Sequence, residues 1–410
     1  MAPIRLLTFS TLYPSAERSN HGIFVETRLR HLLGSGAVTS TVVAPVPWFP
    51  SGAARFGTWG RFARTKRRET RHGIDVHHPR YAVIPKVGMT LAPWLLYRAM
   101  LPFMRRLLAT GARVDAIDAH YLYPDGVAAV WLGKRLGIPV VVTARGTDVS
   151  LIPRYAMPRR QIQGAIRDAA ALITVSNALK EALVGLGAPE AQVTVLRNGV
   201  DAAMFHPPRD RAAARAALGL TGPTLLSVGL LIERKGHHRI IEAMPSLPGY
   251  SLLVVGEGPE RARLAALVER LGVGDRVRLL GARPHADLPA FYGAADALVL
   301  ASSREGWANV LLEAMACGTP VIASNIWGNP EVVRAPAAGL IMQANTAEGI
   351  VAATQRLFAN PPDRAATRAY AEAFSWDATT AGQIELFSRV IRLGSRAGLA
   401  STLNGQPPGH

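Results

Sequence analysis

One stretch in the last third of the chain constrains the fold more than any other. Residues 302–319 read SSREGWANVLLEAMACGT, and short apolar runs flank them at 297–301 and 321–323. Apolar runs of this length are typical of buried parallel strands. A glycine-bearing loop and a helix-forming run lie between them. The order strand, loop, helix, strand predicts a parallel α/β sheet.

The same stretch carries two carboxylates, Glu305 in the loop and Glu313 in the expected helix. A helix that begins near Asn309 has unpaired backbone N–H groups at its start, where a phosphate or diphosphate is favoured. Glu313 would lie about one turn along this helix. An anion cradle between two carboxylates suits a ligand with a diphosphate and hydroxyls. The simpler alternative is an ordinary helix with solvated glutamates.

The string EGWANVLLEAMACGTPVIAS, residues 305–324, resembles the signature of the retaining glycosyltransferases of family 4. The resemblance implies the two-domain GT-B fold: two Rossmann-like parallel-sheet domains facing across a cleft, with a C-terminal helix crossing back to the first domain. It also implies that Glu305 holds donor-sugar hydroxyls and that Glu313 holds the ribose of the nucleotide. Further donor-binding residues expected in this motif are Gly306, Trp307, Asn309, Val310 and Leu311.

The length of the chain predicts more than one domain, since 410 residues are long for a single core. We expect an acceptor-binding domain over 1–200, completed by a returning helix over 376–393. A nucleotide-sugar-binding domain is expected over 201–375. Residues 394–410, rich in Gly, Ser and Pro, are predicted to form a disordered tail.

Polar residues follow the predicted strands of the first domain, at the sheet edge where open α/β sheets place ligands. His120 follows the strand expected over 114–119, with Asp125 shortly after it, and Arg145 and Asp148 follow the strand expected over 139–143. His120, Asp125 and Asp148 are therefore expected at the acceptor. Gly22 lies in the loop after the first strand, and the resemblance places such a glycine against the donor diphosphate.

Two positions depart from the family pattern. The family has Gly-Arg-Leu-x-x-x-Lys-Gly where this chain reads GLLIERKG over 229–236, so Lys235 matches but Leu230 replaces the arginine. Arg234 and Arg145 are the available replacements for that charge on the leaving diphosphate. The family usually has His-Gly-x-Asp where this chain has Arg145, whose permanent charge suits an anionic acceptor group or a phosphate. We expect Glu305, Lys235 and Arg145 to act in catalysis and Arg234 to bind the donor.

Positive charge is concentrated in the first half of the chain. Residues 1–200 hold 26 Lys and Arg against 11 Asp and Glu, a net +15, whereas residues 201–410 hold 20 against 18, a net +2. Nucleic acid is not the expected partner, because no zinc-finger spacing, basic zipper or stacking pattern is present. A membrane surface or a lipid-linked acceptor fits better. The segment 55–71, basic with Phe56, Trp59 and Phe62, is either an interfacial anchor or a solvated loop.

Cysteine usage and hydropathy indicate the cellular compartment of the protein. Cys317 is the only cysteine, which fits a reducing compartment, and no apolar run reaches the roughly 18 residues of a spanning helix. We expect a cytoplasmic protein, peripheral on the inner face of the membrane. No metal motif and no cofactor motif is found, so the expected ligand is the nucleotide sugar itself. The sequence does not indicate an oligomeric state.

Together these features predict an enzyme of the hexosyltransferase class. It would transfer a sugar from a nucleotide-diphosphate sugar to an acceptor with retention of configuration, in polysaccharide or glycolipid assembly. The alternatives are a GT-B nucleotide-sugar epimerase, a phosphorylase, and a non-enzymatic nucleotide-sugar-binding protein. The donor base, the hexose, the acceptor and the linkage are not readable from the residues.

Overall fold

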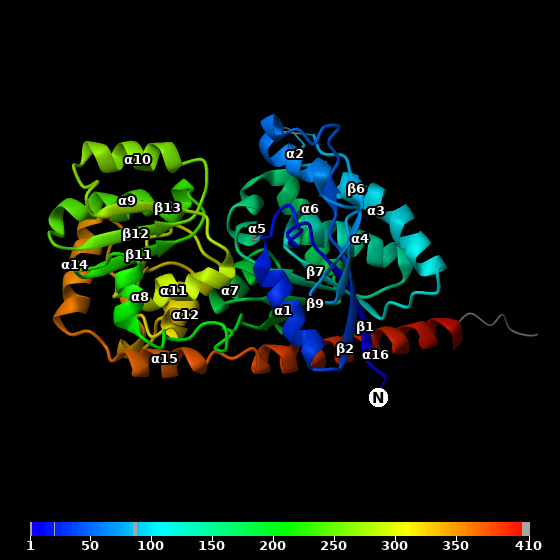
Figure 1. Ribbon diagram of the computed structural model, residues 1–410. Helices are drawn as coiled ribbons and strands as arrows, with labels where there is room; N and C mark the ends of the chain where they lie inside the picture. Colours follow the sequence, from blue (N-terminus) through cyan, green and yellow to red (C-terminus); the bar gives the residue numbers. More distant parts are fainter. Residues whose placement is uncertain (1, 20, 85–87, 404–410) are drawn as a thin grey trace, which may run out of the picture. The chain divides into compact units, whose positions relative to one another are not determined.

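The computed structural model describes residues 2–19, 21–84 and 88–403, and the side chains as far as residue 394. The chain divides into two compact units, one formed by Met1–Leu196 with Asp377–His410 and one by Arg197–Trp376 (Figure 1). The first boundary lies at 196/197, four residues before the expected one. Each unit is built on its own sheet.

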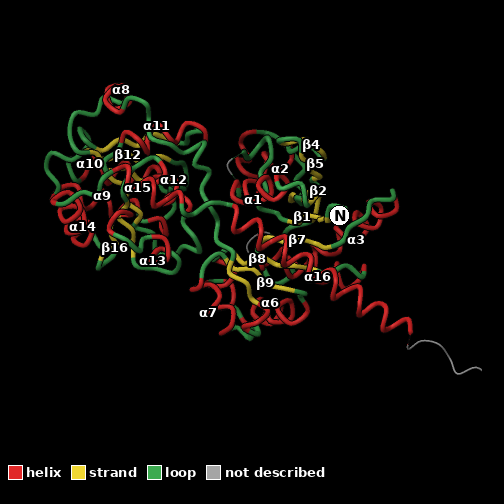
Figure 2. The backbone as a smooth tube through the Cα atoms, turned by 90° about the horizontal axis from the view of Figure 1, so that it is seen from below, coloured by secondary structure: helices red, strands yellow, loops and turns green. Residues whose placement is uncertain are grey.

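The first unit contains an eight-stranded sheet in the order β10-β9-β8-β7-β1-β2-β5-β4 (Figure 2). All neighbouring pairs are parallel except β4 with β5. Two short strands, β3 (Val46–Pro47) and β6 (Arg80–Tyr81), pair separately. The strands of the large sheet are β1 (Ile4–Phe9), β2 (Val38–Val43), β4 (Arg68–Arg71), β5 (Ile74–His77), β7 (Ala116–His120), β8 (Val140–Ala144), β9 (Ala171–Thr174) and β10 (Val193–Val195).

Helices enclose this sheet, and one of them returns from the end of the chain. Leu386, Phe387 and Val390 of that last helix join a buried cluster with Leu6 and Leu32, so the expected crossing back to the first domain is confirmed. The helices of the unit are α1 (Ile23–Gly34), α2 (Gly57–Arg64), α3 (Ala92–Ala109), α4 (Val127–Leu136), α5 (Thr147–Ser150), α6 (Ala156–Asp168), α7 (Asn177–Gly185) and α16 (Asp377–Leu403).

The second unit contains six parallel strands in the order β13-β12-β11-β14-β15-β16. In chain order this is 3-2-1-4-5-6, the dinucleotide-binding arrangement of the doubly wound fold. The central strands β12, β11, β14 and β15 are short apolar runs with mostly buried residues, as a sheet covered on both faces requires, whereas the edge strands β13 and β16 are only partly buried. The strands are β11 (Thr224–Val228), β12 (Ser251–Val255), β13 (Val277–Gly281), β14 (Ala297–Leu300), β15 (Val321–Ser324) and β16 (Gly339–Met342).

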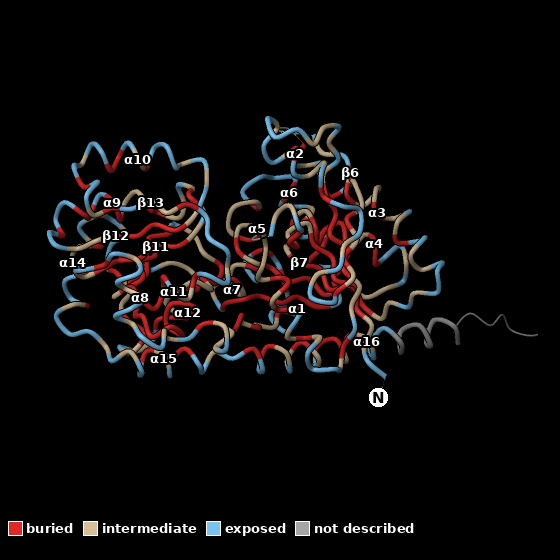
Figure 3. The backbone as a smooth tube through the Cα atoms, in the orientation of Figure 1, coloured by how far each residue is buried: buried red, intermediate tan, exposed pale blue. Residues whose placement is uncertain are grey.

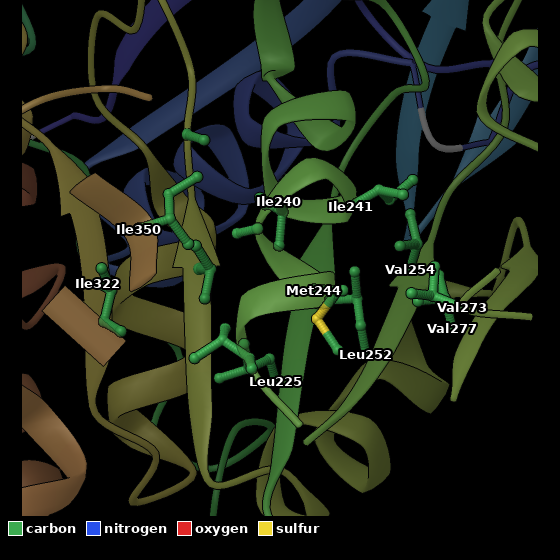
Figure 4. Close-up of a cluster of buried hydrophobic side chains, with 14 of the residues drawn as sticks. Leu225, Ile240, Ile241, Met244, Leu252, Val254, Val273, Val277, Ile322 and Ile350 are labelled. Carbon is green, nitrogen blue, oxygen red and sulfur yellow. The ribbon is translucent and has the colours of Figure 1, made fainter. Parts of the chain in front are cut away.

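The core of the second unit lies between its sheet and the helices that follow the strands. Leu225 and Leu252 of the sheet pack with Ile240 and Met244 beside them (Figure 4), and the central strands β11 and β12 are largely buried (Figure 3). Burying aliphatic side chains of this size contributes roughly 1.5–3 kcal/mol each. The helices are α8 (Arg211–Ala217), α9 (His237–Ala243), α10 (Arg261–Arg270), α11 (Leu288–Ala294), α12 (Asn309–Ala316), α13 (Asn329–Val332), α14 (Ala347–Ala359) and α15 (Arg364–Glu372).

Two regions differ from the sequence-based expectation. The segment 55–71 is not a loop but forms α2 and β4, and the rings of Phe56, Trp59 and Phe62 stack with one another or with Phe49 at 5.2–5.7 Å. These rings therefore pack against one another within the fold, at the centroid spacing that aromatic pairs prefer. Helix α16 continues to Leu403, past the expected start of the tail, and residues 404–410 of that tail lie outside the described residues.

Candidate functional site

The donor-site residues of the second unit gather where its strand order reverses. Strands β11 and β14 are neighbours in the sheet, and their crossovers leave toward opposite sides. Ligands of open α/β sheets bind at the carboxyl ends of such strands. The loop after β11 carries Leu230, Arg234 and Lys235, and the loop after β14 carries Glu305. The topology therefore brings two sequence motifs, 70 residues apart, to one place.

The centre of this site is a buried ion pair. The Nζ of Lys235 lies 2.6 Å from Oε1 of Glu305, and the hydroxyl of Ser302 donates to the same oxygen at 2.8 Å. Burial alone would raise the pKa of Glu305, but the ammonium of Lys235 outweighs it and holds this pKa below the usual value. Oε2 of Glu305 accepts no hydrogen bond from the described residues. Glu305 is thus ionised, and one oxygen remains for a hydroxyl of a ligand.

Arg234 is anchored beside this pair, whereas Leu230 is not. The guanidinium of Arg234 donates to the carbonyl of Arg304 at 3.3 Å, and the N–H of Ser303 donates to the carbonyl of Arg234 at 2.8 Å. The Leu230 side chain is 58% exposed and brings no charge. The two loops are therefore tied together through Arg234, which places a cation next to Glu305.

Helix α12 begins at Asn309 with no side-chain cap on its first turn. Of the three expected backbone donors, the N–H of Leu311 already donates to the carbonyl of Ala308 at 3.1 Å. Asn309 and Val310 supply the first N–H groups, which have no acceptor within the helix. The side chain of Asn309 accepts a hydrogen bond from Asn198 at 3.1 Å. The anion cradle thus rests on two backbone donors rather than three.

Glu313 lies further along α12, and both of its oxygens accept hydrogen bonds. Nε2 of His285 lies 3.1 Å from Oε1, and the hydroxyl of Tyr292 donates to Oε2 at 2.8 Å. Burial would lower the pKa of His285, but its contact with Glu313 raises it. A carboxylate has about four lone-pair positions. Glu313 can therefore accept a ribose hydroxyl while these two side chains fix its orientation.

The two residues after Glu305 are buried in different ways. Gly306 lies within the loop, and the Trp307 ring packs 6.2 Å from the ring of Phe374, with the guanidinium of Arg197 5.8 Å from its centre. The indole N–H of Trp307 is buried and has no acceptor among the described residues. Trp307 therefore supports the loop that carries Glu305 through its contacts with Phe374 and Arg197.

The predicted residues of the first unit form a second cluster, at the end of β7 and β8. His120 lies between Asp118, 3.1 Å from its Nε2, and Arg145, whose guanidinium donates to its Nδ1 at 2.7 Å. Nδ1 is thus the acceptor, so the proton of the neutral ring is on Nε2. Burial lowers the pKa of His120 and keeps it neutral. The guanidinium of Arg145 also lies 5.1 Å from the centre of the Phe24 ring.

A second arginine is buried in this cluster. Arg28 of α1 is 1% exposed, donates to the carbonyl of Leu196 at 3.0 Å, and has two further nitrogens without an acceptor in the described part of the chain. Burial lowers the pKa of Arg28 to about 10. Burial, with Arg28 nearby, lowers the pKa of Arg145 to about 9. The carboxylate of Asp118 interacts with both guanidiniums, and that of Asp148 interacts with Arg145 as well.

The two carboxylates expected at the acceptor, Asp125 and Asp148, hold loops in place. Asp148 accepts backbone N–H groups of Leu122 at 2.6 Å and Gly146 at 2.7 Å, which ties the loop after β7 to the loop after β8. Asp125 accepts the backbone N–H of Thr11 at 2.7 Å and its hydroxyl at 2.9 Å, which fixes the loop after β1. Both carboxylates therefore position the loops around His120.

Gly22 stands at the start of α1 because only glycine fits there. Its φ is 64°, and a Cβ would lie 1.8 Å from the carbonyl oxygen of Leu12. Tyr121, directly after His120, has φ of 82°, a conformation that costs a non-glycine residue energy and often marks a functional loop. Both residues shape the loops at the carboxyl end of this sheet.

Several residues of the two clusters were not predicted. Arg28, His285 and Tyr292 join them only through the tertiary fold, whereas Asp118 and Ser302 lie two and three residues before the site residues that they contact. His237 had a signal, since it follows the Lys235-Gly236 pair. Its Nδ1 lies 2.9 Å from the Ser227 hydroxyl and its Nε2 lies 3.2 Å from the carbonyl of Leu230. Burial lowers its pKa to about 4, so it is a neutral support of the loop after β11.

Sequence comparisons agree with this arrangement. The profile of "Glycosyltransferase Family 4" matches residues 62–203, and that of "Glycosyl transferases group 1" matches residues 208–374. The D-inositol 3-phosphate glycosyltransferase of Segniliparus rotundus is 33% identical over 311 residues, which cover 70% of this chain and 68% of that relative. The protein of that name from Mycobacterium tuberculosis is 32% identical over 303 residues, 68% of this chain and 62% of that relative.

Solved structures share the fold. Sucrose-phosphate synthase from Thermosynechococcus elongatus superposes with a TM-score of 0.77 at 22% identity, covering 95% of this chain and 100% of that one. The Anabaena protein HepE, solved in complex with UDP, superposes with a TM-score of 0.70 at 21% identity, covering 94% and 100%. At these identities the likeness concerns the fold.

The chain therefore belongs to the family 4 glycosyltransferases, and its fold is GT-B. It is an enzyme of the hexosyltransferase class, which transfers a sugar from a nucleotide sugar. The epimerase alternative is not favoured, because the relatives are named glycosyltransferases. Within the described residues, no group of three or more His, Cys, Asp or Glu is placed to hold a metal ion.

Proposed function

We propose that this chain transfers a hexosyl group from a nucleoside-diphosphate hexose to an anionic, lipid-linked acceptor, with retention of anomeric configuration. The observation that carries the donor half of this proposal is the Lys235–Glu305 pair, 2.6 Å apart at the switch point of the Rossmann-like sheet. It joins a cation for a diphosphate to a carboxylate for sugar hydroxyls at one place.

Each donor-site residue has one role in this scheme. An ammonium has three N–H donors, so Lys235 can hold Glu305 with one and contact a diphosphate oxygen with another. Arg234 and the first N–H groups of α12 add further positive charge where the leaving diphosphate develops its own negative charge. Oε2 of Glu305 accepts a donor-sugar hydroxyl, and Glu313 accepts a ribose hydroxyl.

The reaction needs no enzyme nucleophile on this site. The acceptor hydroxyl attacks the anomeric carbon from the face that the diphosphate leaves, the bond from that carbon to the phosphate oxygen breaks, and the hydroxyl proton passes to the departing phosphate. Configuration is retained because both events use one face. The enzyme stabilises the diphosphate and excludes water, which separates transfer from hydrolysis.

The acceptor half rests on charge. His120 and Arg145 lie at the carboxyl ends of β7 and β8, and Arg28 adds a second buried guanidinium. A phosphate or another anionic group on the acceptor would offset this charge. The curated relatives are named for a phosphorylated acceptor, D-inositol 3-phosphate, which supports an anionic acceptor here.

The site is tested with Glu305→Ala and Glu313→Ala. We expect Glu305→Ala to lower turnover strongly and Glu313→Ala chiefly to weaken nucleotide binding, measured by steady-state kinetics once a thermal-shift screen of nucleotide sugars has identified the donor. A ligand at 100 times its dissociation constant adds about 2.7 kcal/mol to stability. Glu242→Ala, an exposed glutamate on α9, is the control. Near-normal kinetics for both site variants would overturn the assignment.

A peripheral position on the inner face of the membrane is the remaining part of the proposal. No helix among the described residues is long and apolar enough to cross a bilayer. The first 200 residues carry the net charge of +15, and Trp48 and Trp94 are 60% and 48% exposed. Sedimentation with anionic vesicles tests this, with Arg61→Gln/Lys66→Gln expected to weaken it. Failure to sediment at low salt would contradict it.

A further inference from the structure

A cavity of the first unit lies outside both clusters described above. It has a volume of about 500 Å³ and is bounded by the start of β4, the segment from the end of β5 into β6, and α3. Helix α3 packs against β6 (Figure 1). None of the residues that line this cavity belongs to the donor site or to the cluster around His120.

The ionisable side chains that line the cavity are all basic, and Thr110 is the one other polar residue among its lining residues. No Asp or Glu is among its lining residues. The basic side chains that line it are Arg67, Arg68, His77, His78, Arg80 and Arg106. Such a concentration of cations around one hollow favours an anion, since the low-dielectric walls strengthen the field inside it.

Some of these basic residues are already neutralised. Arg68 is paired with Asp75 at 2.7 Å, and Nε2 of His78 lies 2.8 Å from Glu69. Arg67, Arg80 and Arg106 have no carboxylate partner within the described residues. At least three positive charges therefore remain for a ligand.

Arg80 is the best fixed of the three. Its guanidinium donates to the backbone carbonyls of Thr65 and Ala63, and its other terminal nitrogen is buried with no acceptor in the described part of the protein. Burial first, and repulsion from Arg67 second, lower the pKa of Arg80. A buried guanidinium nitrogen with no acceptor costs free energy, and Arg80 is one of the residues that line the cavity.

The remaining wall of the cavity is apolar. Ala99, Phe103 and Leu107 occupy one face of α3 at helical spacing, and the ring of Phe103 meets His77 edge to face at 5.5 Å. A free inorganic anion has no apolar surface to bury against such a wall. An amphiphile that carries a phosphoryl head and an apolar chain would contact both the guanidiniums and the helix.

We infer that this cavity is a binding site for the phosphoryl group of an anionic amphiphile, with Arg67, Arg80 and Arg106 around the phosphate and α3 against the chain. The site is separate from glycosyl transfer and does not depend on the proposed roles of the donor residues. It gives the basic first unit a defined place at which to recognise a phosphorylated lipid.

The binding test uses soluble probes and the whole chain. Isothermal titration compares monomeric dihexanoyl phosphatidate, dihexanoyl phosphatidylcholine, sn-glycerol 3-phosphate and inorganic phosphate. We expect saturable binding of phosphatidate at least tenfold tighter than that of glycerol 3-phosphate, with phosphatidylcholine weaker than phosphatidate. Equal affinity for phosphatidate and glycerol 3-phosphate would assign the cavity to soluble phosphate esters and overturn the amphiphile. No saturable binding of any phosphate would overturn the site.

Variants locate the binding. Arg67→Gln/Arg106→Gln should lower phosphatidate affinity at least tenfold, because both side chains are exposed at the cavity and hold no described carboxylate. Arg105→Gln removes the same charge from the adjacent residue of α3, which does not line the cavity, and should leave affinity within about twofold. Phe103→Ser should lower affinity for phosphatidate but not for glycerol 3-phosphate. Equal losses in the Arg105 control and the double variant would overturn the location.

Discussion

The two polar clusters bury carboxylates in opposite ways. In the second unit Glu305 lies against the ammonium of Lys235, and its pKa is held below the usual value. In the first unit Asp125 accepts only neutral donors from Ser10 and Thr11, and burial raises its pKa to about 7. A carboxylate with a cation stays ionised and can serve a ligand, whereas one held by neutral donors serves the fold.

The largest effect should come from separating the charges of the donor site. Lys235→Met removes the cation expected at the diphosphate, so we expect turnover to fall roughly 100- to 1,000-fold. It also leaves Glu305 buried without its partner, at a cost of about 3 kcal/mol in the free energy of unfolding. Steady-state kinetics and urea unfolding measure the two losses.

The double variant Lys235→Met/Glu305→Gln separates these effects. Removing both charges should restore most of the free energy of unfolding but none of the turnover, since the pair would then be neutral and the diphosphate would still lack its cation. Turnover within threefold of wild type in the Lys235→Met single variant would contradict the role of the pair.

The comparison also explains what the sequence could predict. Most strands of the two large sheets are short apolar runs that were identifiable one by one, although β5 (Ile74–His77) was not predicted, and Lys235 and Glu305 lie in motifs at strand ends. Strand β4 (Arg68–Arg71) was missed because an antiparallel edge strand with no apolar residue carries no such pattern. Peripheral pairing of this kind depends on the neighbouring strand, β5, and not on the local residues.

The hydrogen-bond partners of the site residues could not be predicted from the sequence, for a related reason. His285 and Tyr292 contact Glu313 from 28 and 21 residues away in the chain, and only the packing of α11 and of the turn before it against α12 brings them there. Arg28 looks like a surface residue of an amphipathic helix, yet it is fully buried. Distant contacts of single polar side chains leave no periodicity to read.

A smaller effect is expected at the donor-site position where Leu230 stands in place of the family arginine. If Arg234 takes over the role of the arginine that is absent at position 230, Arg234→Gln should lower turnover about 10- to 100-fold. One charge-assisted hydrogen bond contributes about 1.5–3 kcal/mol. Adding Leu230→Arg to Arg234→Gln should recover most of this loss. Kinetics with a saturating donor measure both variants. An unchanged rate in the single variant would mean that Lys235 and the N–H groups of α12 bind the diphosphate without Arg234.

Asp125 provides the corresponding test in the first unit. Its folded pKa of about 7 lies above the unfolded value near 4, so the folded state binds the proton more tightly. Its stabilising contribution is therefore present below pH 4 and is lost as the pH rises toward 7. Relative to Asp125→Asn, wild type should lose roughly 1 kcal/mol of unfolding free energy per pH unit between pH 5 and 6. Urea unfolding at each pH measures the difference, and a flat difference would contradict the burial argument.

The smallest expected effect contrasts two histidine–carboxylate pairs. Contact with Glu313 raises the pKa of His285, so its stabilising contribution is complete below about pH 6.5 and is lost as the pH rises through the folded pKa. Burial lowers the pKa of His120 despite Asp118, so its contribution is lost as the pH falls. Against pH, the stability differences of His285→Gln and His120→Gln from wild type should slope in opposite directions, by about 0.5–1 kcal/mol each. Slopes of the same sign in urea unfolding would mean that the two units treat their charged groups alike.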